Sequence, residues 1–388
     1  MRQTLFLPFL FFAMLFSACD QQATKIASKQ MTPPKRIGLP NGWSLTPVGE
    51  HLPLGDLPLQ ILLTADGKRA IATNNGQSAH SLTVVDLESK KVLQELSIPK
   101  AWYGLAWHPG EKTLYASGGY DNCIRIYDFN GSSLTYRDSI ALARPWPNDN
   151  ISPAGIAVDA EGKTLYTVSK DGRSGLFVAD IASRKLTNRV DLAAEAYACL
   201  LSKDQTQLYI SLWGGAAIAV YDIKTQKIAS TIPVALHPNE MALSPDGSLL
   251  YVACADDNAV AVVDLKQGKM SELITTSLYP NAPTGSTANS LALTPDGKTL
   301  YVANADNNCL AVFDVSANGK SRSEGSIPTG WYPTSVRVAN EQVYVANGKG
   351  NTGSMANPKG PDPVTRRTPE TQYIGGLFKG SLSIIPQP

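Results

Sequence analysis

The residues best suited to binding chemistry are aromatic, amide and charged side chains that recur in short loops along the chain. Rings offer flat apolar faces, amides donate and accept hydrogen bonds, and charged groups fix orientation, which is the combination that small polar ligands require. The same residue types are common in tight turns, so each of them could also serve only as a turn or packing residue. We predict a face for a ligand or partner formed by Trp102, Tyr103, Trp146, Tyr197, Trp213, Asn239, Glu240, Asn289, Asn304, Trp331, Tyr332, Asn347, Lys349, Arg366 and Arg367.

The sequence contains no strong catalytic or metal-binding motif. No Gly-x-Ser-x-Gly elbow or Walker loop occurs, and the four histidines form no His-x-His pair. Asp256-Asp-Asn258 and Asp306-Asn-Asn308 lack the glycine and distal glutamate of a calcium loop. We therefore expect no catalytic residue, no metal and no cofactor. If the protein is an enzyme, Glu240, His237 and Arg366 are the only candidates for acid–base chemistry.

A repeat positions these residues. The segment Ala242-Leu-Ser-Pro-Asp-Gly-Ser-Leu-Leu-Tyr-Val-Ala253 is closely matched fifty residues later by Ala292-Leu-Thr-Pro-Asp-Gly-Lys-Thr-Leu-Tyr-Val-Ala303. A period of roughly 40–45 residues with short strands and turns is typical of a four-stranded β-propeller blade. Seven anchor positions mark seven copies: Ile71, Tyr115, Tyr166, Tyr209, Tyr251, Tyr301 and Tyr344. We predict an all-β, seven-bladed β-propeller with four-stranded antiparallel blades.

The seventh copy lacks a fourth strand of its own. Its third strand must be Ser381-Leu-Ser-Ile-Ile385, after which the chain ends. Residues 44–54 precede the first copy and can supply the missing strand. Closing the ring in this way removes an exposed sheet edge, which is otherwise prone to aggregation. We therefore expect the ring to be closed by an N-terminal strand.

Loops of an antiparallel blade alternate between two ends. The Pro-Asp-Gly turns between first and second strands lie at one end. The loops that enter the first strands and those that join second to third strands lie at the other, and the predicted binding residues gather in them. The segment 348–379 leaves from this end and is far longer than an ordinary connection, which favours a functional loop. We expect Lys349, Arg366 and Arg367 to contact a partner or an anionic ligand; a solvated loop is the alternative.

The repeat core Pro-Asp-Gly-Lys-x-Leu-Tyr-Val-Ala-Asn resembles the YVTN family of bacterial β-propeller repeats. Gly330-Trp-Tyr-Pro-Thr334, Asn357-Pro-Lys-Gly-Pro361 and Tyr373-Ile-Gly-Gly-Leu-Phe-Lys-Gly-Ser-Leu382 are similar to segments of bacterial propellers that precede a phosphoesterase domain of the alkaline phosphatase superfamily. This chain ends where that domain would begin, so the resemblance implies no hydrolytic activity. It implies a propeller that could act beside a separately encoded phosphoesterase.

The N-terminus is typical of a secreted lipoprotein. Arg2 is followed by an apolar run, and Phe16-Ser-Ala-Cys19 resembles a lipobox, with Phe16 where Leu is more common. We predict a signal peptide over 1–18, lipidation of Cys19, a flexible tether over 19–37 and a propeller over 38–388. Cleavage without lipid is the alternative at Cys19. The expected location is the bacterial cell envelope, on the periplasmic side or at the outer membrane.

Composition narrows the function classes. A net charge of +1 and 17% charged residues do not favour a nucleic-acid surface, which needs a basic stripe. We expect Cys123, Cys199, Cys254 and Cys309 to be buried free thiols. We also expect a monomer that acts as a ligand-binding or protein-interaction module at the mouth of the central channel. The alternatives are a lactonase-like enzyme and a non-catalytic partner of a phosphoesterase.

Overall fold

The computed structural model describes residues 36–39, 42–77, 79–170, 174–279, 281–350 and 378–388. All of them belong to one compact unit, Lys35–Pro388. Strands dominate this unit, and its only helical elements in the described ranges are three short 3-10 turns. No helix in the described part of the chain is long and apolar enough to cross a membrane.

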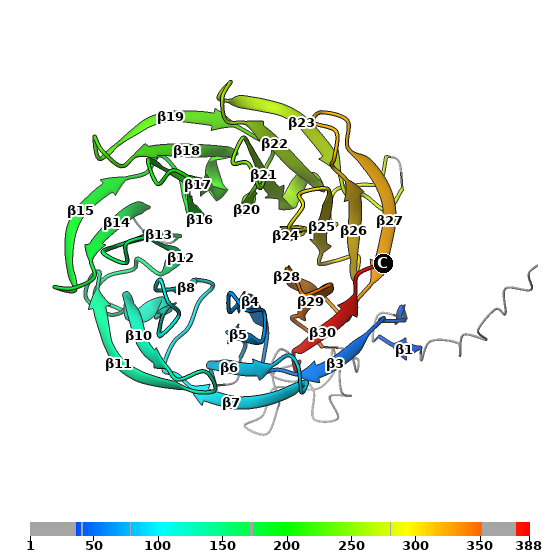
Figure 1. Cartoon of the computed structure of the whole chain (residues 1–388), viewed down its shortest axis with the longest axis horizontal. Helices are drawn as coiled ribbons and strands as arrows, with labels where there is room; N and C mark the ends of the chain where they lie inside the picture. Colours follow the sequence, from blue (N-terminus) through cyan, green and yellow to red (C-terminus); the bar gives the residue numbers. More distant parts are fainter. Residues whose placement is uncertain (1–35, 40–41, 78, 171–173, 280, 351–377) are drawn as a thin grey trace, which may run out of the picture. The chain divides into compact units, whose positions relative to one another are not determined.

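Seven four-stranded antiparallel sheets are arranged in a ring, as the sequence predicts (Figure 1). We call the region enclosed by the first strands of the blades the channel. Blade 1 consists of β4 (Pro58–Leu63), β5 (Arg69–Asn74), β6 (Ser81–Asp86) and β7 (Lys91–Ser97). Blade 2 consists of β8 (Leu105–Trp107), β9 (Thr113–Ser117), β10 (Cys123–Phe129) and β11 (Leu134–Ala141). Blade 3 consists of β12 (Pro153–Val158), β13 (Thr164–Ser169), β14 (Gly175–Asp180) and β15 (Lys185–Asp191). Blade 4 consists of β16 (Ala196–Leu201), β17 (Gln207–Leu212), β18 (Ala217–Asp222) and β19 (Lys227–Pro233). Blade 5 consists of β20 (Pro238–Leu243), β21 (Leu249–Cys254), β22 (Ala259–Asp264) and β23 (Lys269–Thr275). Blade 6 consists of β24 (Ala288–Leu293), β25 (Thr299–Asn304), β26 (Cys309–Asp314) and β27 (Arg322–Pro328). The 3-10 turns are η1 (Gly119–Asp121), η2 (Trp213–Gly215) and η3 (Ala255–Asp257).

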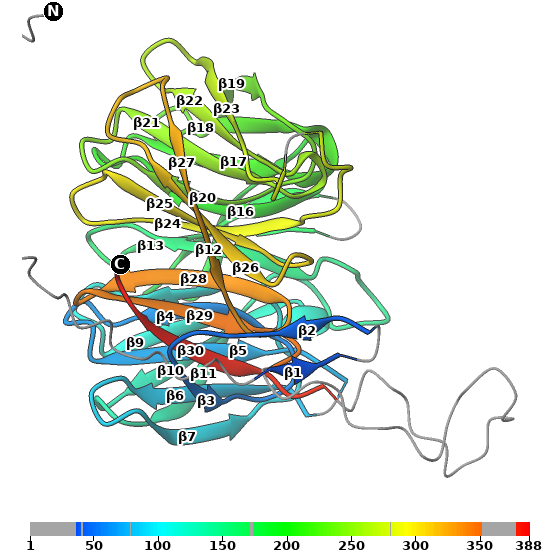
Figure 2. The ribbon, with the colours of Figure 1, turned by 90° about the vertical axis from the view of Figure 1, so that its right-hand side faces the viewer.

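Blade 7 is completed by the N-terminal strand, which confirms the predicted ring closure. It contains β28 (Pro333–Ala339), β29 (Gln342–Asn347) and β30 (Ser381–Pro386), and its outer strand is β3 (Glu50–Pro53). Four residues of β3 pair with β30, in a register that places Leu52 opposite Leu382. The short hairpin of β1 (Ile37–Gly38) and β2 (Ser44–Leu45) precedes β3 and was not predicted (Figure 2).

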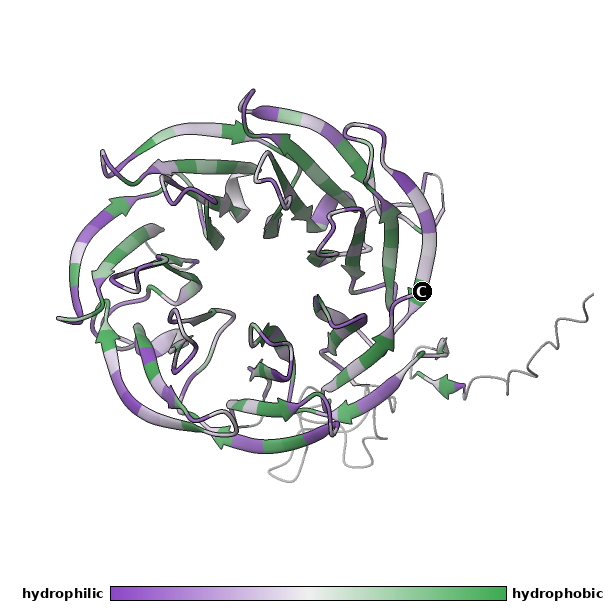
Figure 3. Ribbon diagram, in the orientation of Figure 1, coloured by the Kyte–Doolittle hydropathy of each residue, from purple (hydrophilic) through white to green (hydrophobic). Residues whose placement is uncertain are grey.

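The core consists of layers between adjacent blades. All seven predicted anchors are buried, from Ile71 and Tyr115 at 0% exposure to Tyr166 and Tyr209 at 4%. Apolar residues dominate the inner strands, whereas the outer strands alternate in polarity (Figure 3). Each blade therefore depends on its neighbours to bury its apolar faces, as in other repeat architectures.

Side-chain caps stabilise the turns at one end of the ring. In the Ser244–Gly247 turn, the Ser244 hydroxyl and the backbone N–H of Ser248 donate to the carboxylate of Asp246. These hydrogen bonds lower the pKa of Asp246 to about 2. Gly247 has a φ of +74°, which a side chain would disfavour. The Pro-Asp-Gly segments are therefore structural turns.

The predicted state of four cysteines is confirmed: Cys123, Cys199, Cys254 and Cys309 are free and buried. Burial raises the pKa of the Cys199 and Cys254 thiols to about 12. Thiols with such pKa values stay protonated and unreactive near neutral pH.

Candidate functional site

Loops at the end opposite the Pro-Asp-Gly turns bring many of the predicted residues together. We call this end the mouth face; it comprises the loops that enter the first strands and those that join second to third strands. Its described part carries two clusters in which a lysine ammonium lies over aromatic rings. Neither lysine forms an ion pair with a carboxylate in the part of the chain that the structure describes.

The first cluster is centred on Lys170 and joins blades 2, 3 and 4. The Lys170 Nζ atom lies 4.4 Å from the ring centroid of Trp213, 5.7 Å from that of Tyr197 and 5.8 Å from that of Trp102. The ring of Tyr197 in turn packs on Tyr103 at a centroid distance of 4.6 Å. These distances allow cation–π attraction between the ammonium and the rings.

The second cluster is centred on Lys349 and lies in blade 7. Its Nζ atom lies 4.2 Å from the ring centroid of Tyr332, 5.4 Å from that of Trp331 and 5.9 Å from that of Phe378. Burial lowers the pKa of Lys349, and the negative charge of Asp306 partly offsets this effect. An ammonium that is partly desolvated in this way gains more from an anionic partner than an exposed one does.

A largely buried ion pair joins the inner strands of blades 5 and 7. The Arg337 guanidinium on β28 donates to both carboxylate oxygens of Glu240 on β20, at 3.2 Å from Nη1 to Oε2 and 2.5 Å from Nη2 to Oε1. The Ser290 hydroxyl on β24 also donates to this carboxylate. Side-chain exposure is only 11% for Glu240 and 20% for Arg337. The pair thus links blades 5, 6 and 7.

Tyr103 connects this ion pair to the mouth face. Its ring is buried, and burial, reinforced by the charge of the nearby Glu240, raises the Tyr103 pKa well above its ordinary value. A cavity of about 150 Å³ lies between Tyr103, Glu240, Cys199 and Gln60. The buried Oε1 atom of Gln60 has no hydrogen-bond partner among the described residues. Hydrogen bonds from Arg337 and Ser290 fix the orientation of the Glu240 carboxylate at the edge of this cavity.

The inner strands carry small residues where they approach each other at the level of Glu240. Gly104 and Gly155 occupy the equivalent position in blades 2 and 3, and an added Cβ would meet Ala154 O at 2.0 Å and Ala198 Cα at 2.7 Å, respectively. Glycine is thus required there by close backbone approach rather than by a turn.

Of the three candidates for acid–base chemistry, the two that the structure describes have different partners. The His237 ring stacks on Trp213 at 4.0 Å between centroids, and its Nδ1 atom lies 2.6 Å from an Asp256 oxygen. Glu240 is instead bound by Arg337 in the channel. Arg366 lies outside the described residues, as do Arg367 and Cys19. No cluster of metal-ligating side chains occurs among the residues that are described.

The remaining predicted residues differ in accessibility. Trp146 is 58% exposed and lies 6.0 Å from the ring of Tyr120. Asn239 is buried and donates to Asn289 at 3.1 Å. Asn304 and Asn347 are fully buried. The amide of Asn304 donates to the Thr276 carbonyl, and that of Asn347 donates to Ser381 and Ser383, so both position strands within the protein instead of facing a ligand.

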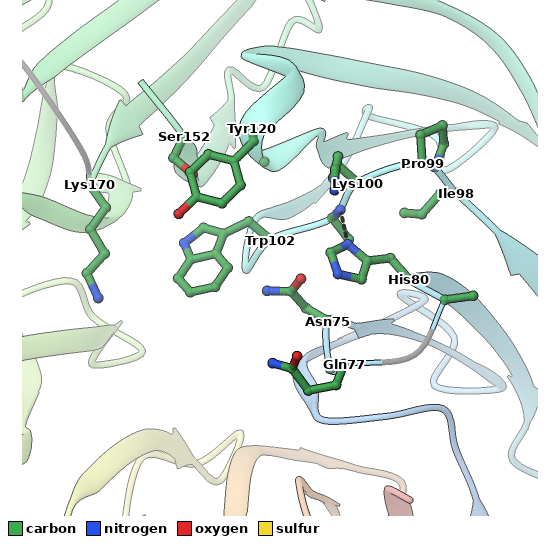
Figure 4. Close-up of a pocket in the computed structure, with 14 residues that line it drawn as sticks. Asn75, Gln77, His80, Ile98, Pro99, Lys100, Trp102, Tyr120, Ser152 and Lys170 are labelled. Carbon is green, nitrogen blue, oxygen red and sulfur yellow. Dashed lines mark hydrogen bonds between the residues drawn. The ribbon is translucent and has the colours of Figure 1, made fainter. Parts of the chain in front are cut away.

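A larger cavity of about 640 Å³ lies on the mouth face between blades 1, 2 and 3. Figure 4 shows Trp102 near its centre, between Lys170 on one side and Asn75 and His80 on the other. The backbone N–H of Ala101 donates to His80 Nδ1 at 2.9 Å, which ties the blade 1 loop to the loop that enters blade 2.

Sequence reasoning missed Arg337, Ser290 and most of the larger cavity. Arg337 faces Tyr344 in the strand register, a position at which blade 5 has Ala242 and blade 6 has Ala292. A charged residue that replaces alanine in an inner strand is a signal that could have identified Arg337.

The fold and this face define the class: the chain is a seven-bladed β-propeller with a polar and aromatic mouth. Residues 238–357 match the family model described as lactonase, 7-bladed beta-propeller. Residues 66–214 match the model of the SMP-30/gluconolactonase/LRE-like region. Both models describe β-propeller domains, and each covers less than half of the chain. A search among curated proteins finds no match.

Two solved structures illustrate the similarity of fold. Hydrazine synthase of Kuenenia stuttgartiensis is 19% identical with a TM-score of 0.62, over 77% of this chain and 95% of that one. U3-55K is 14% identical with a TM-score of 0.65, over 86% of this chain and 98% of that one. At these identities the likeness concerns the fold alone.

Proposed function

We propose that the protein is a binding module whose mouth face contacts a small polar ligand or a protein partner. The observation that carries this proposal is the pair of lysine–aromatic clusters at Lys170 and Lys349. Each presents a cation without a carboxylate partner in the described ranges, beside aromatic faces that supply apolar contact area. Clustered aromatic residues with a few charged groups are typical of binding surfaces.

A crosslinking pull-down from the native membrane tests this function. Trp331→Ala removes one ring of the Lys349 cluster, and we expect it to reduce capture of the partner or ligand while the ring of blades stays folded. Tyr136→Ala is a matched control, because Tyr136 is a 51% exposed aromatic residue on the outer strand β11. Full capture by Trp331→Ala would contradict the assignment of the mouth face.

We further propose that the protein is a lipid-anchored component of the bacterial cell envelope, with lipid on Cys19 and the tether predicted over 19–37. The lipobox-like sequence Phe16-Ser-Ala-Cys19 supports this proposal. Acyl chains on Cys19 would add about 0.8 kcal/mol of membrane affinity for each buried CH₂ group. Mass spectrometry of the mature N-terminus should find an acylated Cys19; an unmodified cysteine would contradict the anchor.

A lactonase-like enzyme is the second candidate, because the lactonase family model matches residues 238–357, which include Glu240 and Arg337. An acid–base role would have to act from the carboxylate of Glu240, which borders the small channel cavity. Hydrolysis of glucono-δ-lactone, followed with a pH indicator, tests this candidate. Activity that Glu240→Gln abolishes would favour the enzyme, whereas a rate equal to buffer alone would exclude this substrate.

A partner role beside a separate phosphoesterase rests on the YVTN-like repeat and the Gly330-Trp-Tyr-Pro-Thr334 segment. Trp331 and Tyr332 of that segment belong to the Lys349 cluster, so a phosphoesterase domain would contact the mouth face at blade 7. Recovery of a phosphoesterase in the same pull-down, and its loss with Trp331→Ala, would support this role.

A further inference from the structure

The larger cavity on the mouth face has the composition of a site for an anion. Lys100 and Lys170 are both in its lining, and no aspartate or glutamate is among the described residues that line it. Two ammonium groups, with no carboxylate among the described lining residues, make the cavity electropositive at neutral pH, and a concave wall concentrates that field. A neutral or cationic ligand would gain nothing from this charge.

The same cavity offers a flat apolar surface and hydrogen-bonding groups. Trp102 lies near its centre, and the exposed ring of Tyr120 lies beside it (Figure 4). The amides of Asn75 and Gln77 and the hydroxyl of Ser152 provide donors and acceptors in the lining. An aromatic plane flanked by amides and hydroxyls matches a ring that has an apolar face and several hydroxyl groups.

The walls of the cavity are held in place before any ligand arrives. The hydrogen bond from Ala101 N–H to His80 Nδ1 fixes the blade 1 loop against the loop that enters blade 2. Lys170, from blade 3, is held over the Trp102 and Trp213 rings. The volume of about 640 Å³ is within the range of roughly 300–1,000 Å³ of small-molecule sites. Little ordering is therefore required on binding.

We propose that this cavity between blades 1, 2 and 3 binds an anionic sugar, meaning a hydroxylated ring with a carboxylate or phosphate group. The ring packs on Trp102, and the amides of Asn75 and Gln77 bind its hydroxyls. Lys170, whose ammonium lies over the Trp102 ring, binds the anionic group, and Lys100 on the other side of the cavity adds to the positive potential. This inference rests on the proposed function, because it places one ligand class on the mouth face.

Isothermal titration of the intact protein tests the inference with four probes. These are galacturonate and glucose 6-phosphate as the anions, and galactose and glucose as their neutral counterparts. We expect at least one anion to bind more tightly than its neutral counterpart by about tenfold, since a charge-assisted hydrogen bond contributes that much. The anion that binds identifies carboxylate or phosphate as the recognised group.

Variants locate the binding site. Lys170→Gln should weaken binding of the anion by about tenfold, and Lys100→Gln should weaken it by a smaller factor. Trp102→Ala should weaken binding of the anionic and the neutral sugars alike. Lys203→Gln, which lies in a turn at the opposite end of the ring, makes the same charge change and should leave binding unaffected. Absence of binding by both anions, or binding that Lys100→Gln and Lys170→Gln do not alter, would overturn the inference. Either result would leave the Trp331-dependent capture of a partner as a separate test of the proposed function.

Discussion

Removing the arginine of the channel ion pair is the perturbation with the largest expected effect on stability. Arg337→Met leaves the carboxylate of Glu240 buried, with the Ser290 hydroxyl as its remaining hydrogen-bond donor among the described residues. Loss of one member of a buried ion pair costs roughly 3–5 kcal/mol, most of which is the penalty of an uncompensated charge. With an unfolding entropy of about 2.1 cal/mol/K per residue, a unit of this length should lose about 4–7 °C in Tm.

Differential scanning calorimetry of four proteins measures this effect: the wild type, Arg337→Met, Glu240→Gln and the double variant. The double variant removes both charges, so it should be less destabilised than the sum of the single variants by at least about 2 kcal/mol. Arg137→Met is the control, because the Arg137–Asp128 pair is exposed at 46% and 53% and should contribute less than about 1 kcal/mol. A change in Tm below about 2 °C for Arg337→Met would refute the view that this ion pair is desolvated and stabilises the ring. A double variant whose loss of stability equals the sum of the two single losses would refute it as well.

Three further predictions concern single groups. Tyr103→Phe removes a hydroxyl buried near Glu240, and calorimetry should show a loss of about 0.5–1.5 kcal/mol; an unchanged Tm would contradict a stabilising contact of this hydroxyl. Burial lowers the pKa of His80 below 6.5, so the unfolded chain takes up its proton first and stability should fall as the pH drops below 6.5. His80→Gln should reduce that fall in Tm between pH 7.5 and 5, and an equal fall in both proteins would contradict it. Cys199 and Cys254, whose pKa burial raises to about 12, should not react with Ellman's reagent at pH 8 until the protein is unfolded; rapid modification of the native protein would contradict their burial.

The fold was predictable because its determinants are local and repeated. Anchors such as Tyr251 and Tyr301 recur at one position of each blade, and period-2 strands between turns carry the rest of the pattern. Ring closure was predictable as well, since an unpaired β30 edge would be unfavourable and the segment before blade 1 could cover it.

The interior of the channel was less predictable because it depends on residues brought together by the closure of the ring. Glu240 and Arg337 are 97 residues apart and come from blades 5 and 7, so no local spacing indicates their contact. Asn304 and Asn347 show a second limit, because their loop-like composition indicated the mouth face, yet both side chains are fully buried. Asn347 is bonded within blade 7, and Asn304 donates to the Thr276 carbonyl that follows the outer strand of blade 5. Residues that stabilise a turn and residues that face a ligand are of the same amino-acid types, so the sequence alone does not distinguish them.

The central claim is that the two lysine–aromatic clusters of the mouth face bind the ligand or partner. The most direct test is a crosslinking pull-down from the native membrane with the wild type and with a variant that carries both Lys170→Gln and Lys349→Gln. These substitutions remove the two cations and leave every ring in place. We predict that the component captured by the wild type is lost from the variant, while a Lys203→Gln protein retains it. Equal capture by all three proteins, or no component captured by the wild type, would contradict the claim.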